Sequence, residues 1–329
     1  MRVFARLLMS LLLVAGVVLG AGAWWLYSPI ALRLPPASTV LDLEVEPGMP
    51  AAQVAETVVS SGAQVNVQLL QLWFRASGQA RQIKAGSYEM TPGTSPHSLL
   101  AMLVRGDQSL KSVTLVEGWT FSQVRAALQK AELLAPDSSG LQADSIMEKL
   151  GRAGVHPEGR FFPDTYTYAK GSSDLAVLLR AAKAMDKRLN AAWALRNPDT
   201  PLKSPEQALI LASIVEKETG KPGDRAQIAG VFTNRLRIGM RLQTDPSVIY
   251  GLGSAFDGNI RKRDLQADTL YNTYTRAGLP PTPSAMPGKA ALLAVMQPLP
   301  TKALYFVARG DGSSEFSASL DDHNRAVNK

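Results

Sequence analysis

The most prominent apolar stretch of the chain covers residues 7–27, which are 21 consecutive uncharged residues. A helix of about 20 apolar residues crosses the hydrocarbon core of a bilayer. Arg2 and Arg6 precede the stretch and predict a cytoplasmic amino terminus, with everything after residue 28 exported. The small residues 21–23 also fit a signal-peptide cleavage site. We favour a retained anchor, residues 1–28, because the apolar stretch continues past that site.

The next part of the chain predicts a small folded module. Residues 29–38 carry three prolines and no periodicity, which is typical of a short extended linker. From residue 39 the pattern changes to a strand at 40–46, helices at 51–62 and 65–78, and a strand at 86–91. The order strand, helix, helix, strand defines a module that we place at 39–110.

The remainder, residues 111–329, reads as a larger mixed α+β domain. Amphipathic helices are predicted at 121–133 and 174–193, and a buried strand at 303–308 precedes a hairpin turn at 310–312. Residues 158–166 place aromatic side chains beside an arginine and an aspartate, which suits either a sugar-binding cleft or a packed, turn-rich corner.

One apolar helix of this domain ends in two acids. Ser204 is a natural N-cap, and Gln207 three residues later completes a predicted capping box. The helix is apolar almost all round, and Gly220 is expected to end it. Glu216 and Glu218 then lie in the last turn and point about 200° apart, because each helical residue turns by about 100°. At most one of them can face a given cleft.

The position of Glu218 suits a proton donor. Partial negative charge at a helix carboxyl end and apolar surroundings both raise the pKa of a carboxyl group. A general acid needs to hold its proton near neutral pH. The alternative is that both glutamates pair with Lys217, Lys221 or Arg225 on a solvated rim.

Composition excludes several classes of chemistry. The chain has no cysteine and three well-separated histidines, so we expect no disulfide, no metal and no cofactor. Its formal net charge of +7 suits an anionic partner such as a lipid headgroup or a cell-wall polymer. No run of basic residues with interleaved aromatics supports binding to nucleic acid.

Four sequence blocks then point to a known family. They are IVEKET from Ile214, NRLRIGMRLQTDPSVIYG from Asn234, YNTYTRAGLPPTP from Tyr271, and LYFVARGDG from Leu304. Together they resemble the YceG-like (MltG) family of endolytic murein transglycosylases, and the blocks follow the family order from Glu117 to His323.

The resemblance implies a fold, an activity and a site. The 39–110 module resembles a LysM-like glycan-associated module, and 111–329 the catalytic domain. The family cleaves the MurNAc-GlcNAc bond within nascent glycan strands without water and leaves 1,6-anhydro ends. Glu218 matches the catalytic acid, and the remaining site residues are carried over as substrate-binding: Glu216, Gln243, Asp245, Tyr271, Asn272 and Tyr274. The expected partners are peptidoglycan glycan strands, the inner membrane and, as further candidates, peptidoglycan synthases, with the domains after residue 28 in the periplasm.

Two other functions stay open on the residues. One is a non-catalytic, membrane-tethered protein that binds the wall or regulates a synthase. The other is a hydrolase that uses water, with Asp245 as the second carboxylate that such enzymes need. The products distinguish the three: anhydro ends, no cleavage, or reducing ends.

Overall fold

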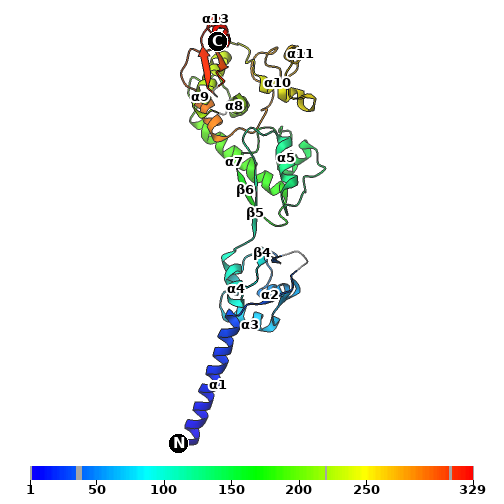
Figure 1. Ribbon diagram of the computed structural model, residues 1–329, viewed down its shortest axis with the longest axis vertical. Coiled ribbons are helices and arrows are strands. Elements are labelled where there is room, and N and C mark those ends of the chain that lie inside the picture. The colour runs from blue at the N-terminus through cyan, green and yellow to red at the C-terminus, as the bar shows by residue number, and fades with distance from the viewer. Residues whose placement is uncertain (1, 35–38, 219–220, 311–312, 329) are drawn as a thin grey trace. The chain divides into compact units, whose positions relative to one another are not determined.

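The computed structural model describes residues 2–34, 39–218, 221–310 and 313–328. These residues belong to two packed units, Met1–Lys111 and Ser112–Lys329, each with its own helices and strands (Figure 1). The predicted mixed α+β class is therefore confirmed. Gly220, part of the predicted linker and part of the predicted hairpin turn lie outside the described residues.

The first unit is built around a pair of antiparallel strands. Its elements are α1 (Arg2–Tyr27), β1 (Ala31–Leu32), β2 (Leu41–Val45), α2 (Ala51–Ser60), β3 (Ala63–Gln64), α3 (Val67–Ala76), the 3-10 helix η1 (Ala80–Gln82), β4 (Gly86–Met90) and α4 (Pro96–Arg105). Strand β2 pairs with β4, with Leu43 opposite Tyr88. Alternate residues of β2 are buried against α2, α3 and α4, as expected for a sheet with one covered face. The predicted order strand, helix, helix, strand is present, with the two-residue strand β3 added between the helices.

Two features of this unit concern its amino-terminal part. Helix α1 contains a span, Met9–Tyr27, that is long and apolar enough to cross a membrane, and none of it is buried in the protein. The predicted linker differs from a free spacer, because β1 pairs with β3 and Ile30 is buried in the core of the unit. The Ile30 N–H also donates to the Thr94 carbonyl at 2.8 Å. The chain therefore becomes ordered directly after α1.

The second unit is mainly helical. Its elements are β5 (Leu110–Thr114), α5 (Phe121–Lys130), α6 (Ala143–Lys149), β6 (Thr165–Ala169), α7 (Asp174–Ala194), α8 (Pro205–Glu218), α9 (Pro222–Arg237), α10 (Asp245–Leu252), the 3-10 helix η2 (Gly253–Ala255), α11 (Lys262–Gln266), α12 (Lys289–Met296), β7 (Tyr305–Ala308), β8 (Ser314–Ser317) and α13 (Leu320–Val327). One core lies under α5, α6 and the β5–β6 pair, and another is formed by α7, α8, α9 and α12.

Helix α8 is the central element of this second core. It contacts α7, α9, α10 and α12, and its residues Ala208 to Val215 are all buried. Burial on all sides explains why its sequence is apolar all round rather than amphipathic. The Ser204 hydroxyl accepts the Gln207 N–H at 3.2 Å, as an N-cap does. The predicted capping box is wrong in one detail, because the Gln207 side chain accepts from Lys203 N–H and not from the cap residue.

The aromatic segment at 158–166 is a packed corner and not an open cleft. Phe161 and Phe162 are buried in the two cores of the second unit, and the Tyr166 hydroxyl donates to the Phe162 carbonyl at 2.7 Å. Arg160 pairs with Glu206 in the first turn of α8 at 2.5 Å. The Arg160–Glu206 ion pair thus attaches this segment to the amino-terminal end of α8, the end opposite to Glu218.

Candidate active site

A pocket of about 440 Å³ lies in the second unit where α8 ends. It brings together four of the residues that the sequence singled out: Glu218, Gln243, Asp245 and Tyr274. Six further residues complete its lining: Arg235, Tyr305, Phe306, Leu320, His323 and Asn324. The pocket is therefore assembled from α8, α9, the start of α10, the loop after α11 and the carboxyl-terminal elements.

Glu218 is the last residue of α8 and the most buried acid of the pocket lining. Burial raises its pKa from the usual 4.5 to about 6, and the Asp245 charge acts in the same direction. The Thr244 hydroxyl opposes this rise by donating a short hydrogen bond to Glu218 Oε1. The positive charge of Arg235 also lowers the pKa. The result is a carboxyl group that can both hold and release a proton near neutral pH.

Asp245 stands beside this group on a different element. A proline at 246 disfavours helix at the residue before it, which by itself predicts a loop at 241–246. Helix α10 nevertheless begins at Asp245, because proline is tolerated in the first turn of a helix. The Tyr274 hydroxyl donates to Asp245 Oδ1 at 2.6 Å. Burial raises the pKa of Tyr274, so its hydroxyl keeps the proton that it donates. This pair forms one wall of the pocket.

Gln243 carries an unusual backbone conformation. Its φ of 51° lies in the left-handed region, where a residue with a side chain is strained. The backbone is held there because the Gln243 N–H donates to the Thr273 carbonyl at 3.1 Å and the Thr244 N–H to the Thr273 hydroxyl at 3.0 Å. Strained residues of this kind are concentrated at functional sites. With the backbone in this conformation, the long amide side chain of Gln243 lines the pocket.

Arg235 supports the pocket from α9. Its side chain is buried, and its Nε and Nη1 atoms donate to the carbonyls of Leu304 and Leu242 at 2.7 and 2.6 Å. The guanidinium carbon lies 5.3 Å from the centre of the Tyr305 ring. Arg235 thus joins the segment before α10 to strand β7, and it is the one arginine or lysine in the described lining of the pocket.

Glu216 points elsewhere, as its position two residues before Glu218 requires. It accepts the Gly288 N–H at 2.9 Å and pairs with Arg225 at 3.4 Å, and its side chain is 6% exposed. Burial raises its pKa, and these two partners lower it. The described lining of the pocket does not include Glu216. One of the two glutamates is thus in a solvent-facing cavity and the other in an internal ion pair.

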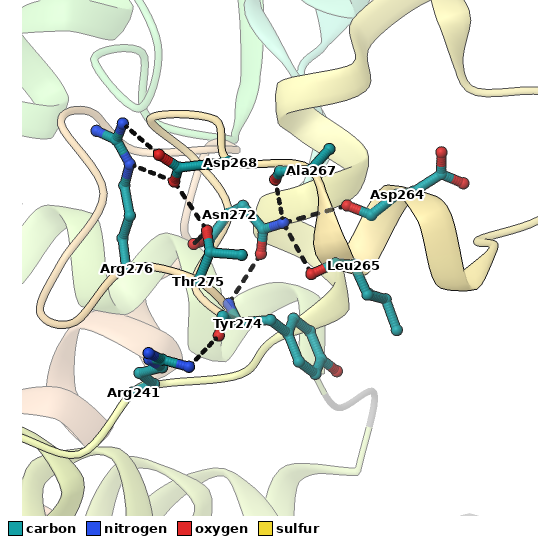
Figure 2. A network of polar contacts seen from close by, with 9 residues as sticks. All are labelled: Arg241, Asp264, Leu265, Ala267, Asp268, Asn272, Tyr274, Thr275 and Arg276. Atoms are coloured by element: carbon teal, nitrogen blue, oxygen red, sulfur yellow. Dashed lines mark hydrogen bonds and ion pairs between the residues drawn. The ribbon is translucent and has the colours of Figure 1, made fainter.

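Asn272 and Tyr271 also lie outside that lining. Asn272 is buried, and its Nδ2 atom donates to the carbonyls of Asp264, Leu265 and Ala267 (Figure 2). Its Oδ1 atom accepts the Tyr274 N–H at 2.9 Å. The Tyr271 hydroxyl shares a hydrogen bond with Thr282 at 2.9 Å.

The same network continues on the surface (Figure 2). Arg241 donates to the Tyr274 carbonyl, and Arg276 and Thr275 contact the Asp268 carboxylate. The loop that carries Tyr274 is therefore held on both sides. Asn272 fixes this loop internally, and the Asp268 ion pair fixes it externally.

The predicted site residues did not include the carboxyl-terminal wall of the pocket, which consists of Tyr305, Phe306, Leu320, His323 and Asn324. Tyr305 and Phe306 lie in a strand that the sequence did predict, and His323 is the last residue of the region over which the family order was followed. Nothing in their spacing places them near Glu218, because the approach depends on how β7 packs on α9 and how α13 packs on β7 and β8. Among the residues that the structure describes, no group of three or more histidine, aspartate or glutamate side chains could hold a metal ion.

The family is shown by comparison of the whole sequence. Residues 43–329 match the model of the YceG-like family, and the chain belongs to that family. Its curated relatives include the endolytic murein transglycosylase of Bacillus subtilis, which is 28% identical over 89% of this chain and 85% of that protein. The endolytic murein transglycosylase of Streptococcus pneumoniae is 26% identical to this chain. The match covers 94% of this chain and 62% of the Streptococcus pneumoniae protein.

A solved structure supports the same relationship. The crystal structure of a YceG-like protein from Listeria monocytogenes is 26% identical and covers 87% of this chain and 98% of its own chain, with a TM-score of 0.54. The similarity thus extends over both packed units.

Proposed function

We propose that this protein is an endolytic peptidoglycan lytic transglycosylase in which Glu218 is the catalytic acid and base. The observation that carries the assignment is a carboxyl group with a pKa of about 6 in an open pocket, within a chain whose relatives are endolytic murein transglycosylases. A general acid works best when its pKa lies near the working pH. The raised pKa meets that requirement without a metal.

Glu218 performs both proton transfers of the reaction. Glu218 first donates its proton to the glycosidic oxygen, and the bond between that oxygen and the anomeric carbon of MurNAc breaks. The C6 hydroxyl of the same MurNAc ring then attacks the anomeric carbon and gives its proton to the Glu218 carboxylate. One C–O bond breaks and one forms, the acid is regenerated, and no water is consumed. General acid–base catalysis of this kind contributes about 10² to 10⁴ in rate.

The remaining candidate residues divide into two groups. Gln243, Asp245 and Tyr274 line the pocket, where they can hydrogen-bond the sugar, and the Asp245 charge can stabilise positive charge that develops at the anomeric carbon. Glu216, Tyr271 and Asn272 take positioning roles in place of direct contact with substrate. Glu216 holds the amino-terminal end of α12, and Asn272 holds the Tyr274 loop.

The product of the reaction tests this function against its alternatives. Purified glycan strands are digested with the full-length protein, and the new ends are identified by mass spectrometry. We expect cuts within the long strands, each of which leaves a new fragment with a 1,6-anhydro end. Reducing ends would instead support the hydrolase with Asp245 as second carboxylate, and intact strands would support a binding or regulatory protein.

The first unit is proposed to hold the glycan rather than to cut it. A pocket of about 510 Å³ lies between the β2–α2 turn and the segment before β4, with Arg75 and Arg81 in its lining. This location and the strand–helix–helix–strand order support the LysM-like glycan-associated module at 39–110. An Arg75→Ala, Arg81→Ala variant should bind glycan strands more weakly while it still forms anhydro ends. Unchanged binding would argue against the role.

Helix α1 is proposed to stay as an inner-membrane anchor, with residues 29–329 in the periplasm. Its apolar span is unburied, and the segment that follows is packed directly into the first unit. Fractionation of cells should find the full-length chain in the inner membrane, protected from protease until the outer membrane is opened. A soluble product that begins near Trp24 would contradict the anchor.

A further inference from the structure

We propose that the carboxyl-terminal wall of the Glu218 pocket is the subsite that recognises the acetamido group of an N-acetylhexosamine ring next to the cleaved bond. This wall consists of Tyr305, Phe306, Leu320, His323 and Asn324. The inference deepens the proposed function and rests on it. It assigns specificity to residues 305–324, whose described side chains supply no acid to the pocket.

The wall is rigidly built from two elements. Strand β7 pairs with β8, and Phe306 packs edge-on against Phe232 of the core, with ring centres 5.8 Å apart. Helix α13 is capped by Ser319, whose side chain accepts the Asp322 N–H. His323 on this helix stacks on Tyr305, with ring centres 5.3 Å apart and planes 24° apart. The stack locks α13 against β7, so side chains on the pocket side of α13 have defined positions.

The chemistry of this wall differs from that of the opposite wall. The opposite wall presents two acids, a hydroxyl and the Gln243 amide. The carboxyl-terminal wall has no acid in its described lining and combines aromatic and aliphatic surface with polar atoms of Tyr305, His323 and Asn324. Leu320 is 53% exposed at the pocket although it is a large apolar side chain. The Nδ1 atom of His323 is buried without a hydrogen-bond partner among the described residues. A binding partner with a methyl group and an amide matches these features.

An acetamido group has this combination, because its methyl group is apolar and its amide both donates and accepts hydrogen bonds. Asn324 can pair with an amide in both directions, since its side chain holds a donor and an acceptor. A carboxylate matches the wall less well. The one arginine or lysine of the described lining, Arg235, already donates through Nε and Nη1 to backbone carbonyls, and Glu218 and Asp245 would repel a further negative charge.

The test combines a variant with a change in the substrate. Full-length wild type and Asn324→Ala are assayed for anhydro ends on peptidoglycan strands and on the same strands with the acetamido groups removed. Asn328→Ala is the matched control, because Asn328 caps the far end of α13 and does not line the pocket. Loss of one hydrogen bond corresponds to about a tenfold change.

On acetylated strands, Asn324→Ala should lower kcat/KM about tenfold, mainly by raising KM, because recognition of a group that does not react stabilises the ground state and the transition state alike. On deacetylated strands the same variant should show little further loss, since two changes to one contact are not additive. Asn328→Ala should match wild type on both substrates.

Equal losses on both substrates, or no loss on either, would overturn the subsite. Failure of wild type to form any anhydro ends would instead refute the proposed function, so the two failures are distinct. Thermal melting checks that each variant is folded, and Asn324→Leu, which is uncharged and similar in size but lacks both the donor and the acceptor, serves if the alanine variant is unstable.

Discussion

Replacing Thr244 by valine tests how the protein sets the proton affinity of its catalytic group. Thr244 is buried, and its hydroxyl donates to Glu218 Oε1. Valine has nearly the same shape and keeps the backbone N–H that donates to Thr273. The substitution therefore removes one hydrogen bond to the carboxylate and little else.

The direction and size of the effect follow from the charge on Glu218. The Thr244 hydroxyl stabilises the ionised form and so lowers the pKa, which stands at about 6. A hydrogen bond to a charged group is worth about 1.5–3 kcal/mol, and one pKa unit corresponds to about 1.4 kcal/mol. Loss of the bond should raise the pKa of Glu218 by about 1–2 units.

The assay is the rate of anhydro-end formation as a function of pH. Because the protonated acid starts the reaction, the wild-type rate should be present below pH 6 and fall as the pH rises through about 6. In Thr244→Val this alkaline fall should move upward by about 1–2 pH units. Thr114→Val is the control, because it removes a hydroxyl that bonds to Thr165 outside the pocket lining, and it should leave the pH of the alkaline fall unchanged. An unmoved alkaline fall in folded Thr244→Val would refute the reasoning.

Three further predictions concern stability. Glu158 is 3% exposed and burial raises its pKa from 4.5 to about 7, so wild type should lose about 3 kcal/mol of unfolding free energy as the pH rises through that range. Denaturant titrations at pH 5 and pH 8 should show this loss in wild type and not in Glu158→Gln; equal losses in both would exclude Glu158 as its source. Alanine in place of a helical glycine normally stabilises a protein by about 0.5–1 kcal/mol. A Cβ at Gly230 would lie 2.6 Å from the Leu299 carbonyl oxygen, however, whereas a Cβ at Gly223 in the same helix would meet open space. Thermal melting should therefore show that Gly230→Ala is destabilised and Gly223→Ala is not, and the reverse order would contradict the packing of α9. Asn272→Ala removes a buried amide with three acceptors and should cost about 1–3 kcal/mol by denaturant titration, with lower activity through the displaced Tyr274 loop; full stability would mean that the loop has other support.

The helix that ends at Glu218 shows what the sequence can predict. Its N-cap, its apolar residues and its divergent pair of acids depend on neighbours within one helix, and local patterns report such features well. The same holds for the strands and helices of residues 40–91. In α8 the apolar residues on every side indicate a fully buried helix, whereas in residues 40–91 the periodicity identifies one buried face, and the structure confirms both.

Features that depend on distant contacts were not predictable in this way. Thr244 bonds Glu218 across 26 positions, and Tyr305 and His323 reach the pocket only through the packing of β7 and α13. The left-handed backbone at Gln243 has no composition signal, since glutamine seldom adopts it. The family resemblance implies a substrate-binding role for Asn272, and its position gives no local sign that its amide bonds the backbone of its own loop.

The central claim is that Glu218 supplies the proton, and Glu218→Gln tests it most directly. The amide is nearly isosteric, can still accept the Thr244 hydroxyl and cannot deliver a proton in the reaction. Anhydro-end formation is measured for wild type, Glu218→Gln and Glu216→Gln, with thermal melting to confirm folding. We expect Glu218→Gln to lose at least about 10²-fold in rate, and Glu216→Gln to lose less. A folded Glu218→Gln protein with near-normal turnover would contradict the account, and a larger loss in Glu216→Gln would move the acid by two residues.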